Sequence, residues 1–242
     1  MSEQAPSALS PVFAYHRATS MIDFPGRIAA VFFTSGCTFA CGFCHNASFM
    51  GRPRPGLPWV TLGKACDDLR QQWADGVVIT GGEPTFWDAQ LDDLIDFVKG
   101  YGFAVKLDTN GARPDVLRRV LPLVDYVAMD LKCAPDRYPE FVGFGRPELI
   151  RESVDVIKAG GTDYEFRTTV IEDVHTDEEM AAIREWVRGA CRYCLQPFQP
   201  RADLPDEEMA GARRTSPDRM REVYRFMQGC ADEVLLRGES LQ

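Results

Sequence analysis

The chain has 242 residues, of which 45% are hydrophobic and 26% charged, so it can bury a substantial core. Its formal net charge of −9 at pH 7 argues against a broad electrostatic surface for nucleic acid or for an anionic membrane. No apolar run approaches the roughly 20 residues that cross a bilayer, and the first residues lack the apolar core of a signal peptide, so we expect a cytoplasmic protein.

Short apolar runs alternate with helical stretches along most of the chain, after residues 1–15, which we expect to form a loose N-terminal tail. Strands are predicted at residues 27–33, 76–80, 104–108, 126–131, 164–170, 193–198 and 233–236. Helices are predicted near residues 61–74, 88–99, 114–121, 147–159, 177–188 and 216–228. Residues 199–215 are rich in proline and charged residues, which predicts a long loop.

This alternation indicates βαβ units and therefore an α/β protein with a parallel sheet and outer helices. Right-handed crossovers would curl the first six strands into a full or partial barrel. The sequence contains no linker or internal repeat, so we predict a single domain over residues 1–242. Polar or cysteine-containing segments lie at or just after the strand ends, where parallel sheets form their sites: 37–44, 81–84, 108–111, 130–132, 167–168 and 196–199.

Three cysteines with the spacing C-x3-C-x2-C follow the first apolar run: Cys37, Cys41 and Cys44. Thiolates so close together in a glycine-containing turn can bind one metal centre. Three of them leave one iron of a four-iron cluster without a protein ligand, and that iron can bind a substrate. Zinc is an alternative, because His45 could be a fourth ligand, although its ring is expected to point away from the centre. A disulfide framework is not expected in a chain with a full-sized core.

The other cysteines and histidines have no partner motif. Cys66, Cys133 and Cys230 are predicted to be small buried hydrophobic side chains. Cys191 and Cys194 flank a predicted strand and are too few for a second cluster. His16 and His175 are predicted to be surface or loop residues.

The segment Gly81-Gly82-Glu83-Pro84 follows the second predicted strand. Paired glycines let a ligand approach the backbone closely, and a carboxylate beside them can accept a charge-assisted hydrogen bond from an ammonium group. Taken alone, the segment fits a tight turn with a solvated glutamate equally well. Its position one βα unit after the three cysteines makes it more specific.

The cysteine motif, with Phe43 before its last cysteine and the Gly-Gly-Glu-Pro turn after it, resembles the radical S-adenosylmethionine enzymes. The resemblance implies a partial (βα)6 TIM-like barrel, a 4Fe-4S cluster on the three cysteines, and S-adenosyl-L-methionine bound at the open iron. Further motifs are similar to those of the activating enzymes of glycyl-radical enzymes: Cys44-His-Asn46, Leu107-Asp-Thr-Asn-Gly111 and Met129-Asp-Leu-Lys132. Residues 20–26 and 195–199 are similar to the activating proteins of anaerobic ribonucleoside-triphosphate reductase.

The resemblance also implies roles for single residues. Glu83 would bind the methionyl ammonium and Arg167 the methionyl carboxylate, while Asp130 and Lys132 match an Asp-x-Lys pair of the family. Further cofactor contacts are expected from Phe43, Asn46, Gly81, Gly82, Thr109 and Gln199. Gln199 stands where some activating enzymes have a histidine, so this contact is expected to be weaker or different. Asp108 and Asp130 match the ligands of a bound Na⁺ or K⁺ in some of these enzymes.

The implied activity is that of a radical SAM oxidoreductase. A flavodoxin- or ferredoxin-like reductant would deliver one electron, S-adenosylmethionine would be cleaved to methionine and a 5′-deoxyadenosyl radical, and this radical would take a hydrogen atom from a glycine of a partner enzyme. The expected partner is anaerobic ribonucleoside-triphosphate reductase. Four alternatives stay open: an activating enzyme of another glycyl-radical enzyme, a radical enzyme acting on a small molecule, a metal-binding interaction module, and an electron-transfer protein.

Overall fold

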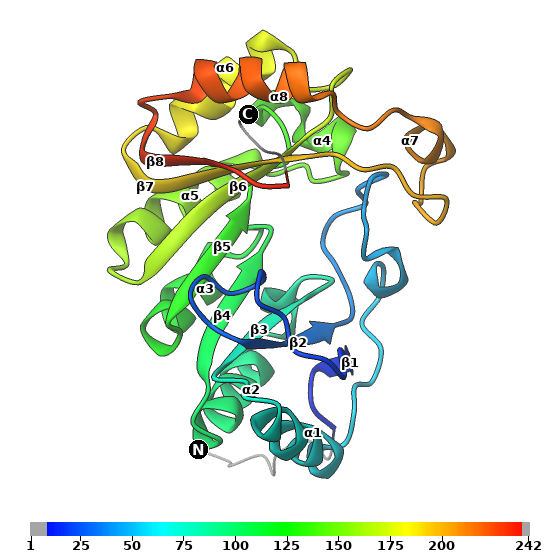
Figure 1. Ribbon diagram of the computed structural model, residues 1–242, viewed down its shortest axis with the longest axis vertical. Coiled ribbons are helices and arrows are strands. Elements are labelled where there is room, and N and C mark those ends of the chain that lie inside the picture. The colour runs from blue at the N-terminus through cyan, green and yellow to red at the C-terminus, as the bar shows by residue number, and fades with distance from the viewer. Residues whose placement is uncertain (1–8, 239–242) are drawn as a thin grey trace.

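The computed structural model describes residues 9–238 and contains an eight-stranded sheet whose strands follow one another in sequence order (Figure 1). The first strand, β1 (Val12–Tyr15), is antiparallel to β2 (Ala29–Thr34). The later neighbours pair in parallel: β3 (Gly76–Gly81), β4 (Ala104–Thr109), β5 (Tyr126–Asp130), β6 (Asp163–Val170), β7 (Ala190–Pro197) and β8 (Ala231–Leu236). The predicted α/β fold with a parallel sheet is confirmed.

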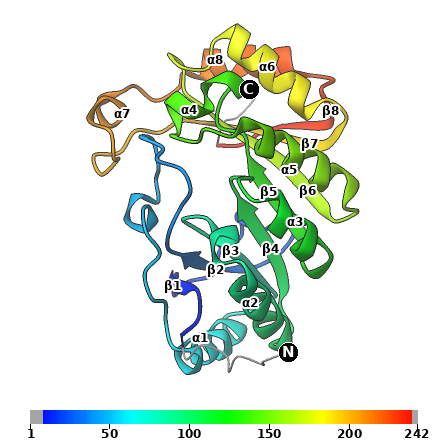
Figure 2. The ribbon, with the colours of Figure 1, turned by 180° about the vertical axis from the view of Figure 1, so that it is seen from behind.

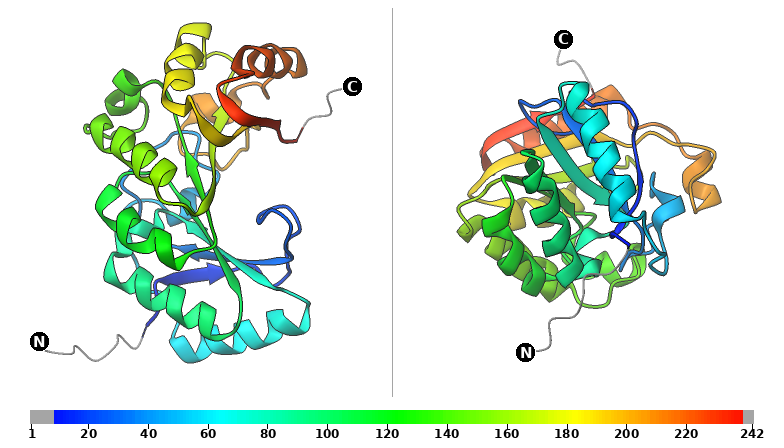
Figure 3. Two further views of the ribbon diagram at one scale, coloured as in Figure 1. Left: turned by 90° about the vertical axis from the view of Figure 1, so that its left-hand side faces the viewer. Right: turned by 90° about the horizontal axis from the view of Figure 1, so that it is seen from below.

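Helices connect the parallel strands and cover the outer face of the curled sheet, as Figures 2 and 3 show from further directions. The longer ones are α1 (Trp59–Gln71), α2 (Ala89–Gly100), α3 (Pro114–Val120), α5 (Pro147–Ala159), α6 (Asp177–Val187) and α8 (Pro217–Met227), and the short ones are α4 (Tyr138–Phe141) and α7 (Glu207–Gly211). None of the helices within residues 9–238 is long and apolar enough to cross a membrane.

The helices form where sequence signals predict them. In α5 the side chains of Ile150, Val154 and Ile157 are buried, and their spacing places them in one stripe that faces the sheet. Helix α8 begins with Pro217, and the Ser216 side chain accepts a hydrogen bond from the backbone N–H of Arg219 at 3.2 Å. The main apolar core therefore lies between the helices and the outer face of the sheet.

The strands alternate between this core and the inside of the barrel. In β4, Val105 and Leu107 belong to the outer core, so Lys106 and Asp108 point to the opposite, inner side. A small apolar cluster also fills part of the interior: Phe24, Ala29, Val78, Tyr126 and Ala128. Charged side chains inside the barrel are thus a consequence of the period of the strand.

The register of the strands brings the predicted site segments to one edge. Thr34 at the end of β2 is paired with Gly81 of β3. Asp130 at the end of β5 is paired with Arg167 of β6. Because neighbouring parallel strands end side by side, segments far apart in the sequence meet there.

The predicted N-terminal tail is partly a strand. Residues 1–8 lie outside the described part of the chain, but Val12–Tyr15 form β1, so the prediction of a loose tail is wrong for these residues. Val12 is fully buried, and its carbonyl accepts a hydrogen bond from the backbone N–H of Leu57 at 2.7 Å. Residues 12–15 are ordered by pairing with a distant segment, so the local sequence pattern does not predict this strand.

The predicted long loop at 199–215 contains the helix α7. The Asp206 side chain accepts hydrogen bonds from the backbone N–H groups of Glu208 at 2.7 Å and Met209 at 3.2 Å, which caps this helix. The backbone N–H of Asp206 donates to the carbonyl of Gly42 at 3.2 Å. The segment is therefore attached to the cysteine loop.

Candidate functional site

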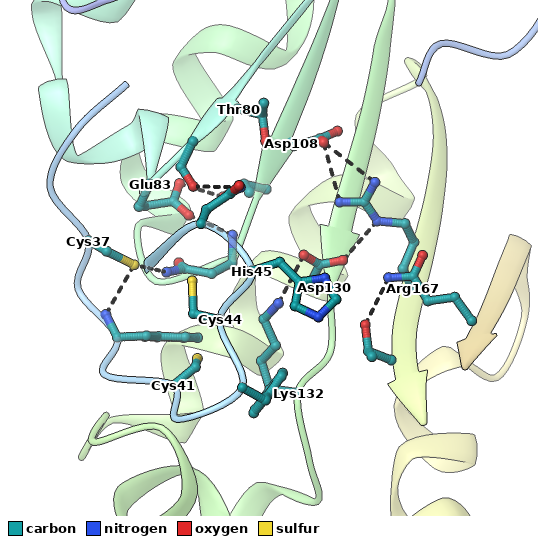
Figure 4. Close-up of a pocket in the computed structure, with 18 of the residues that line it drawn as sticks. Cys37, Cys41, Cys44, His45, Thr80, Glu83, Asp108, Asp130, Lys132 and Arg167 are labelled. Carbon is teal, nitrogen blue, oxygen red and sulfur yellow. Dashed lines mark hydrogen bonds and ion pairs between the residues drawn. The ribbon is translucent and has the colours of Figure 1, made fainter. Parts of the chain in front are cut away.

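A cavity of about 880 Å³ opens at the carboxyl ends of the parallel strands (Figure 4). Every residue predicted for the site lines it: Cys37, Cys41, Phe43, Cys44, Asn46, Gly81, Gly82, Glu83, Asp108, Thr109, Asp130, Lys132, Arg167 and Gln199. The loop after β2 contributes the cysteines, and the ends of β3 to β7 contribute the polar groups. The fold thus brings the predicted residues together, and their individual roles remain predictions.

The three cysteines lie on one loop, with their sulfurs facing a common space in Figure 4. Cys37 Sγ accepts hydrogen bonds from the backbone N–H of Phe39 at 3.4 Å and from Asn110 Nδ2 at 3.7 Å. Burial raises the pKa of the Cys37 thiol to about 11 and that of the Cys41 thiol to about 12. Without a bound metal these thiols are therefore protonated at neutral pH, and metal binding would release their protons.

The donors at this loop fit an iron–sulfur cluster better than zinc. His45 Nε2 lies 2.8 Å from the carbonyl oxygen of Gln199, so the ring is engaged away from the cysteines. Across residues 9–238 no three His, Cys, Asp or Glu side chains are grouped closely enough to hold a single metal ion. Three thiol groups, with N–H donors aimed at the Cys37 sulfur, match the ligands and hydrogen bonds of a four-iron cluster that has one open iron.

Aromatic side chains pack the cysteine loop against residues 141–144. The Phe43 ring stacks on the Phe141 ring at 5.1 Å, and Phe39 packs against Phe144 at 5.0 Å. The backbone N–H of Ala40 also donates to the carbonyl of Val142 at 2.8 Å. The loop is therefore held in shape by apolar packing before any metal binds.

The paired glycines of the turn after β3 are required by contacts with the cysteine loop. A Cβ atom on Gly81 would lie 2.3 Å from the carbonyl oxygen of Thr34, and one on Gly82 would lie 2.1 Å from that of Gly36. The backbone N–H of Gly82 donates to Thr34 at 2.9 Å, and that of Glu83 donates to Gly36 at 2.7 Å. Asn46 Nδ2 adds a hydrogen bond to the Gly81 carbonyl at 3.2 Å. The turn and the loop thus form one unit.

The Glu83 carboxylate is buried, with only 1% of the residue exposed, so the alternative of a solvated glutamate is wrong. Oε1 accepts hydrogen bonds from Thr85 N at 3.1 Å, Thr85 Oγ1 at 2.6 Å and Thr109 Oγ1 at 2.8 Å, and Oε2 accepts one from Asn110 N at 2.6 Å. Burial raises the pKa of this carboxyl, although the hydrogen bonds oppose the shift. Glu83 therefore connects the turn to the end of β4.

Ion pairs cross the opposite side of the cavity in a continuous row. Arg167 Nε donates to Asp130 Oδ1 at 2.8 Å, and Lys132 Nζ donates to Asp130 Oδ2 at 3.0 Å. Burial by itself would raise the pKa of the Asp130 carboxyl, but Arg167 and Lys132 hold it well below its ordinary value. Burial would likewise lower the pKa of Lys132, yet the Asp130 carboxylate holds it above its ordinary value. These groups are charged at neutral pH.

The sequence prediction missed several residues at the site, among them Asn110 and Arg237 in the cavity lining and Lys106 just outside it. Asn110 lines the cavity and touches Cys37 and Glu83, and it could have been found because it belongs to the Asp-Thr-Asn-Gly motif. Lys106 contacts Asp108, and a lysine within an apolar strand was a readable signal. Arg237 also lines the cavity, and no local pattern distinguishes it from other surface arginines.

The cysteines and histidines outside the predicted site differ in their burial. Cys66, Cys133 and Cys230 are buried, as predicted, while Cys191 is exposed and Cys194 is buried. His16 is exposed, as predicted. His175 lies in the loop between β6 and α6, one of the two predicted placements, but it is not at the surface, because the ring is fully buried. Nδ1 accepts a hydrogen bond from Ile171 N at 2.9 Å, and Nε2 lies 3.0 Å from the carbonyl oxygen of Lys132.

The sequence profile of the Radical SAM superfamily matches residues 31–187. The chain is 34% identical to a Methanocaldococcus jannaschii protein named as a glycyl-radical enzyme activating enzyme, over 90% of this chain and 92% of that one. It is 37% identical to the 7-carboxy-7-deazaguanine synthase of Neisseria meningitidis serogroup B, over 45% of this chain and 47% of that one. A radical SAM methyltransferase from Sphaerobacter thermophilus has a similar structure, with a TM-score of 0.68 at 19% identity over 88% of this chain and 67% of that one.

Proposed function

This chain belongs to the radical SAM superfamily, and we propose that it is an activating enzyme of a glycyl-radical enzyme. The observation that carries the proposal is the similarity to a protein of that name along nine-tenths of both chains, at 34% identity. The 7-carboxy-7-deazaguanine synthase of Neisseria meningitidis serogroup B matches less than half of either chain. Cys37, Cys41 and Cys44 would hold a 4Fe-4S cluster, which would supply the one electron needed to split S-adenosylmethionine into methionine and a 5′-deoxyadenosyl radical. This radical would take a hydrogen atom from the partner's glycine and leave a glycyl radical.

The residues of the chain would bind the ends of the cofactor through opposite charges. The three cysteines that would hold the cluster all line the cavity. The Glu83 carboxylate supplies a negative charge for the methionyl ammonium, and Arg167 supplies a positive charge for the methionyl carboxylate. Both side chains are held by hydrogen bonds before the cofactor arrives, so little reorganisation is needed on binding.

Exposed apolar side chains beside the cavity favour a protein substrate. Met21 is 80% exposed and Ile22 is 85% exposed, and Ile22 lines the cavity together with Asp23. Large exposed apolar side chains beside a site are typical of protein interfaces. We infer that the glycine-bearing segment of the partner enters here, and that a flavodoxin- or ferredoxin-like protein supplies the electron.

We propose anaerobic ribonucleoside-triphosphate reductase as the partner. The two segments similar to its activating proteins, 20–26 and 195–199, both contribute to the cavity lining. Ile22 and Asp23 come from the first segment, and Gln196, Pro197 and Gln199 come from the second. Segments that differ among activating enzymes are expected at the surface that meets the partner.

The test begins with anaerobic reconstitution of the chain with iron and sulfide. The reduced protein is expected to show a cluster signal in electron paramagnetic resonance that changes when S-adenosylmethionine is added. With the reductase present, 5′-deoxyadenosine and a glycyl radical should form in equal amounts. Cys41→Ala should lose iron and both products, while Cys194→Ala should keep them, because Cys194 only donates a weak hydrogen bond to Glu165 at 3.4 Å.

A partner in which the radical-bearing glycine is replaced by alanine is the matched control. A glycyl-radical signal that persists with this partner, or cofactor cleavage that never produces the signal with the unchanged partner, contradicts the proposal. Formation of 5′-deoxyadenosine with another glycyl-radical enzyme alone would retain the activating function and change the partner.

A second function is favoured by one observation. Relatives named 7-carboxy-7-deazaguanine synthase match the chain at 37% identity over 111 residues and at 25% identity over 177 residues. A radical enzyme acting on a small heterocyclic substrate would cleave S-adenosylmethionine without any protein partner when that metabolite is added. Product analysis by mass spectrometry in the absence of the reductase separates the two functions.

A further inference from the structure

Lys106 lies inside the barrel, in the middle of β4, and only 1% of the residue is exposed. A buried ammonium group requires a charged partner, because its transfer from water is costly. Its Nζ contacts Oδ1 of Asp108, which points to the same side of the strand two residues later. The lysine is therefore placed directly behind the row of ion pairs in the cavity.

With Lys106 included, each of the four carboxylate oxygens in that row has a cationic partner from the protein. Asp108 Oδ1 contacts Lys106, and Asp108 Oδ2 lies 3.5 Å from the Arg167 guanidinium. Asp130 Oδ1 lies 2.8 Å from Arg167, and Asp130 Oδ2 lies 3.0 Å from Lys132. Figure 4 shows Arg167 between the two carboxylates. A metal ion at Asp108 and Asp130 would compete with three fixed cations.

The charge of the row supports the same conclusion. Lys106, Arg167 and Lys132 carry three positive charges, while Asp108 and Asp130 carry two negative charges, which leaves a net charge of +1. The neighbouring Glu165 is neutralised separately by Arg237, whose Nη1 and Nη2 donate to its two oxygens at 2.7 Å each. The row can therefore accept one carboxylate from a ligand without any added cation.

We propose that Lys106 is a built-in cation that takes the place of the Na⁺ or K⁺ expected at Asp108 and Asp130. The residues present do not fit the metal ion that the sequence prediction placed there. The inference deepens the proposed function at the same site and rests on the binding of S-adenosylmethionine, but it does not depend on which partner is activated. Lys106 is a positioning residue: it holds Asp108, which in turn faces Arg167.

The first experiment measures the unfolding temperature of the metal-free protein in sodium, potassium and choline chloride at equal ionic strength. A specific Na⁺ or K⁺ site would stabilise the folded chain in a saturable way as that ion replaces choline. We expect the three salts to give the same unfolding temperature for the unchanged protein. Saturable stabilisation by Na⁺ or K⁺ overturns the proposal, and this measurement needs neither a variant nor enzyme activity.

The second experiment uses Lys106→Met, which removes the charge and keeps most of the side-chain volume. In choline chloride the reconstituted variant should bind S-adenosylmethionine about tenfold more weakly, the usual effect of losing one charge-assisted interaction. Na⁺ or K⁺ should then bind in the vacated position and restore part of the affinity. Equal affinity of the variant and the unchanged protein in choline chloride overturns the proposal.

Lys158→Met is the matched control. Lys158 Nζ donates to the carbonyl oxygens of Trp186 at 2.8 Å and Arg188 at 2.9 Å, at the end of α6, and it does not line the cavity. Its removal should cause no cation dependence of cofactor affinity. If Lys106→Met fails to fold, the salt comparison on the unchanged protein decides the proposal. Failure to activate any partner would disprove the proposed function and leave both cation measurements valid.

Discussion

The Glu83 carboxylate is held by four hydrogen bonds from two segments, the turn after β3 and the end of β4. Removing the Glu83 side chain would therefore remove both its negative charge and its hydrogen bonds. A substitution that keeps the shape and removes the charge separates the role in cofactor binding from the role in structure.

Glu83→Gln should lower the affinity for S-adenosylmethionine by about tenfold or more, because a charge-assisted hydrogen bond is lost. Iron content should stay unchanged, since the cysteines keep their positions. Titration of the reconstituted protein with the cofactor measures the effect. Thr85→Val is the control: it removes only the 2.6 Å hydrogen bond to Oε1, so the unfolding temperature should fall while the affinity is retained. Unchanged affinity in Glu83→Gln would contradict the assigned role.

His175 predicts a pH dependence of stability. Burial lowers the pKa of its imidazole below the ordinary value of 6.5. The folded state therefore binds fewer protons than the unfolded state, and the stability contribution is present above pH 6.5 and is lost as the pH falls towards the folded pKa. As the pH falls below 6.5, the unfolding temperature of the unchanged protein should fall, whereas that of His175→Gln should stay constant. An equal pH dependence in both proteins would show that other groups are responsible.

At the scale of elements, the loop at 20–26 contributes Ile22 and Asp23 to the cavity lining, and the segment 199–215 contributes Gln199. The first presents Met21 and Ile22 to solvent, and the second is attached to the cysteine loop through Asp206 and Gly42. Helix α7 is capped within this segment, so the segment has its own local structure. Both elements are anchored to the sheet, because Ser20 pairs with Ala29 of β2 and Thr215 Oγ1 donates a hydrogen bond to the carbonyl of Val170 in β6.

Met21→Glu should raise the KM for the partner protein by about tenfold, because a charge replaces a large apolar contact at the interface. The affinity for S-adenosylmethionine should not change, since Met21 does not line the cavity. Glycyl-radical formation at increasing partner concentration measures the effect. Val60→Glu, at a position that is 69% exposed on α1, is the matched control and should leave the KM unchanged. A shift of equal size in both variants would argue against docking at this loop.

At the scale of the whole molecule, the cavity is assembled from residues between positions 22 and 238, which come from nearly all parts of the described chain. Its two sides are built differently. Buried hydrogen bonds around Glu83 join the turn to β4, while ion pairs join β4, β5 and β6 across the barrel. A ligand that contacts both sides should therefore stabilise the complete fold.

S-adenosylmethionine at about a hundred times its dissociation constant should stabilise the reconstituted protein by about 2.7 kcal/mol. For a chain of this size this corresponds to an increase of roughly 5–10 °C in Tm. Differential scanning calorimetry under anaerobic conditions measures the shift. Cys41→Ala should show a much smaller shift, because the open iron is absent. A full shift in that variant would place most of the binding energy outside the cluster.

Local patterns predicted the secondary structure well. The long helices and the strands β2 to β8 correspond to the predicted stretches, because a period of 3.6 or 2 and the turn residues between them are properties of neighbouring residues. β1 and the buried position of His175 were not predictable in this way. Both depend on contacts with segments remote in the sequence, such as Leu57 for Val12 and Lys132 for His175.

The amino-acid sequence alone therefore determined the α/β class, the three cysteines, the Gly-Gly-Glu-Pro turn and the meeting of the strand ends, because each follows from spacing along the chain. Only the tertiary structure decided the partners of the buried charges. Arg167 lies between Asp108 and Asp130 because β4, β5 and β6 pair in one register. Arg237 reaches Glu165, 72 positions away, through the arrangement of β6, β7 and β8. Electrostatic partnership depends on distance in space, which the order of residues does not specify.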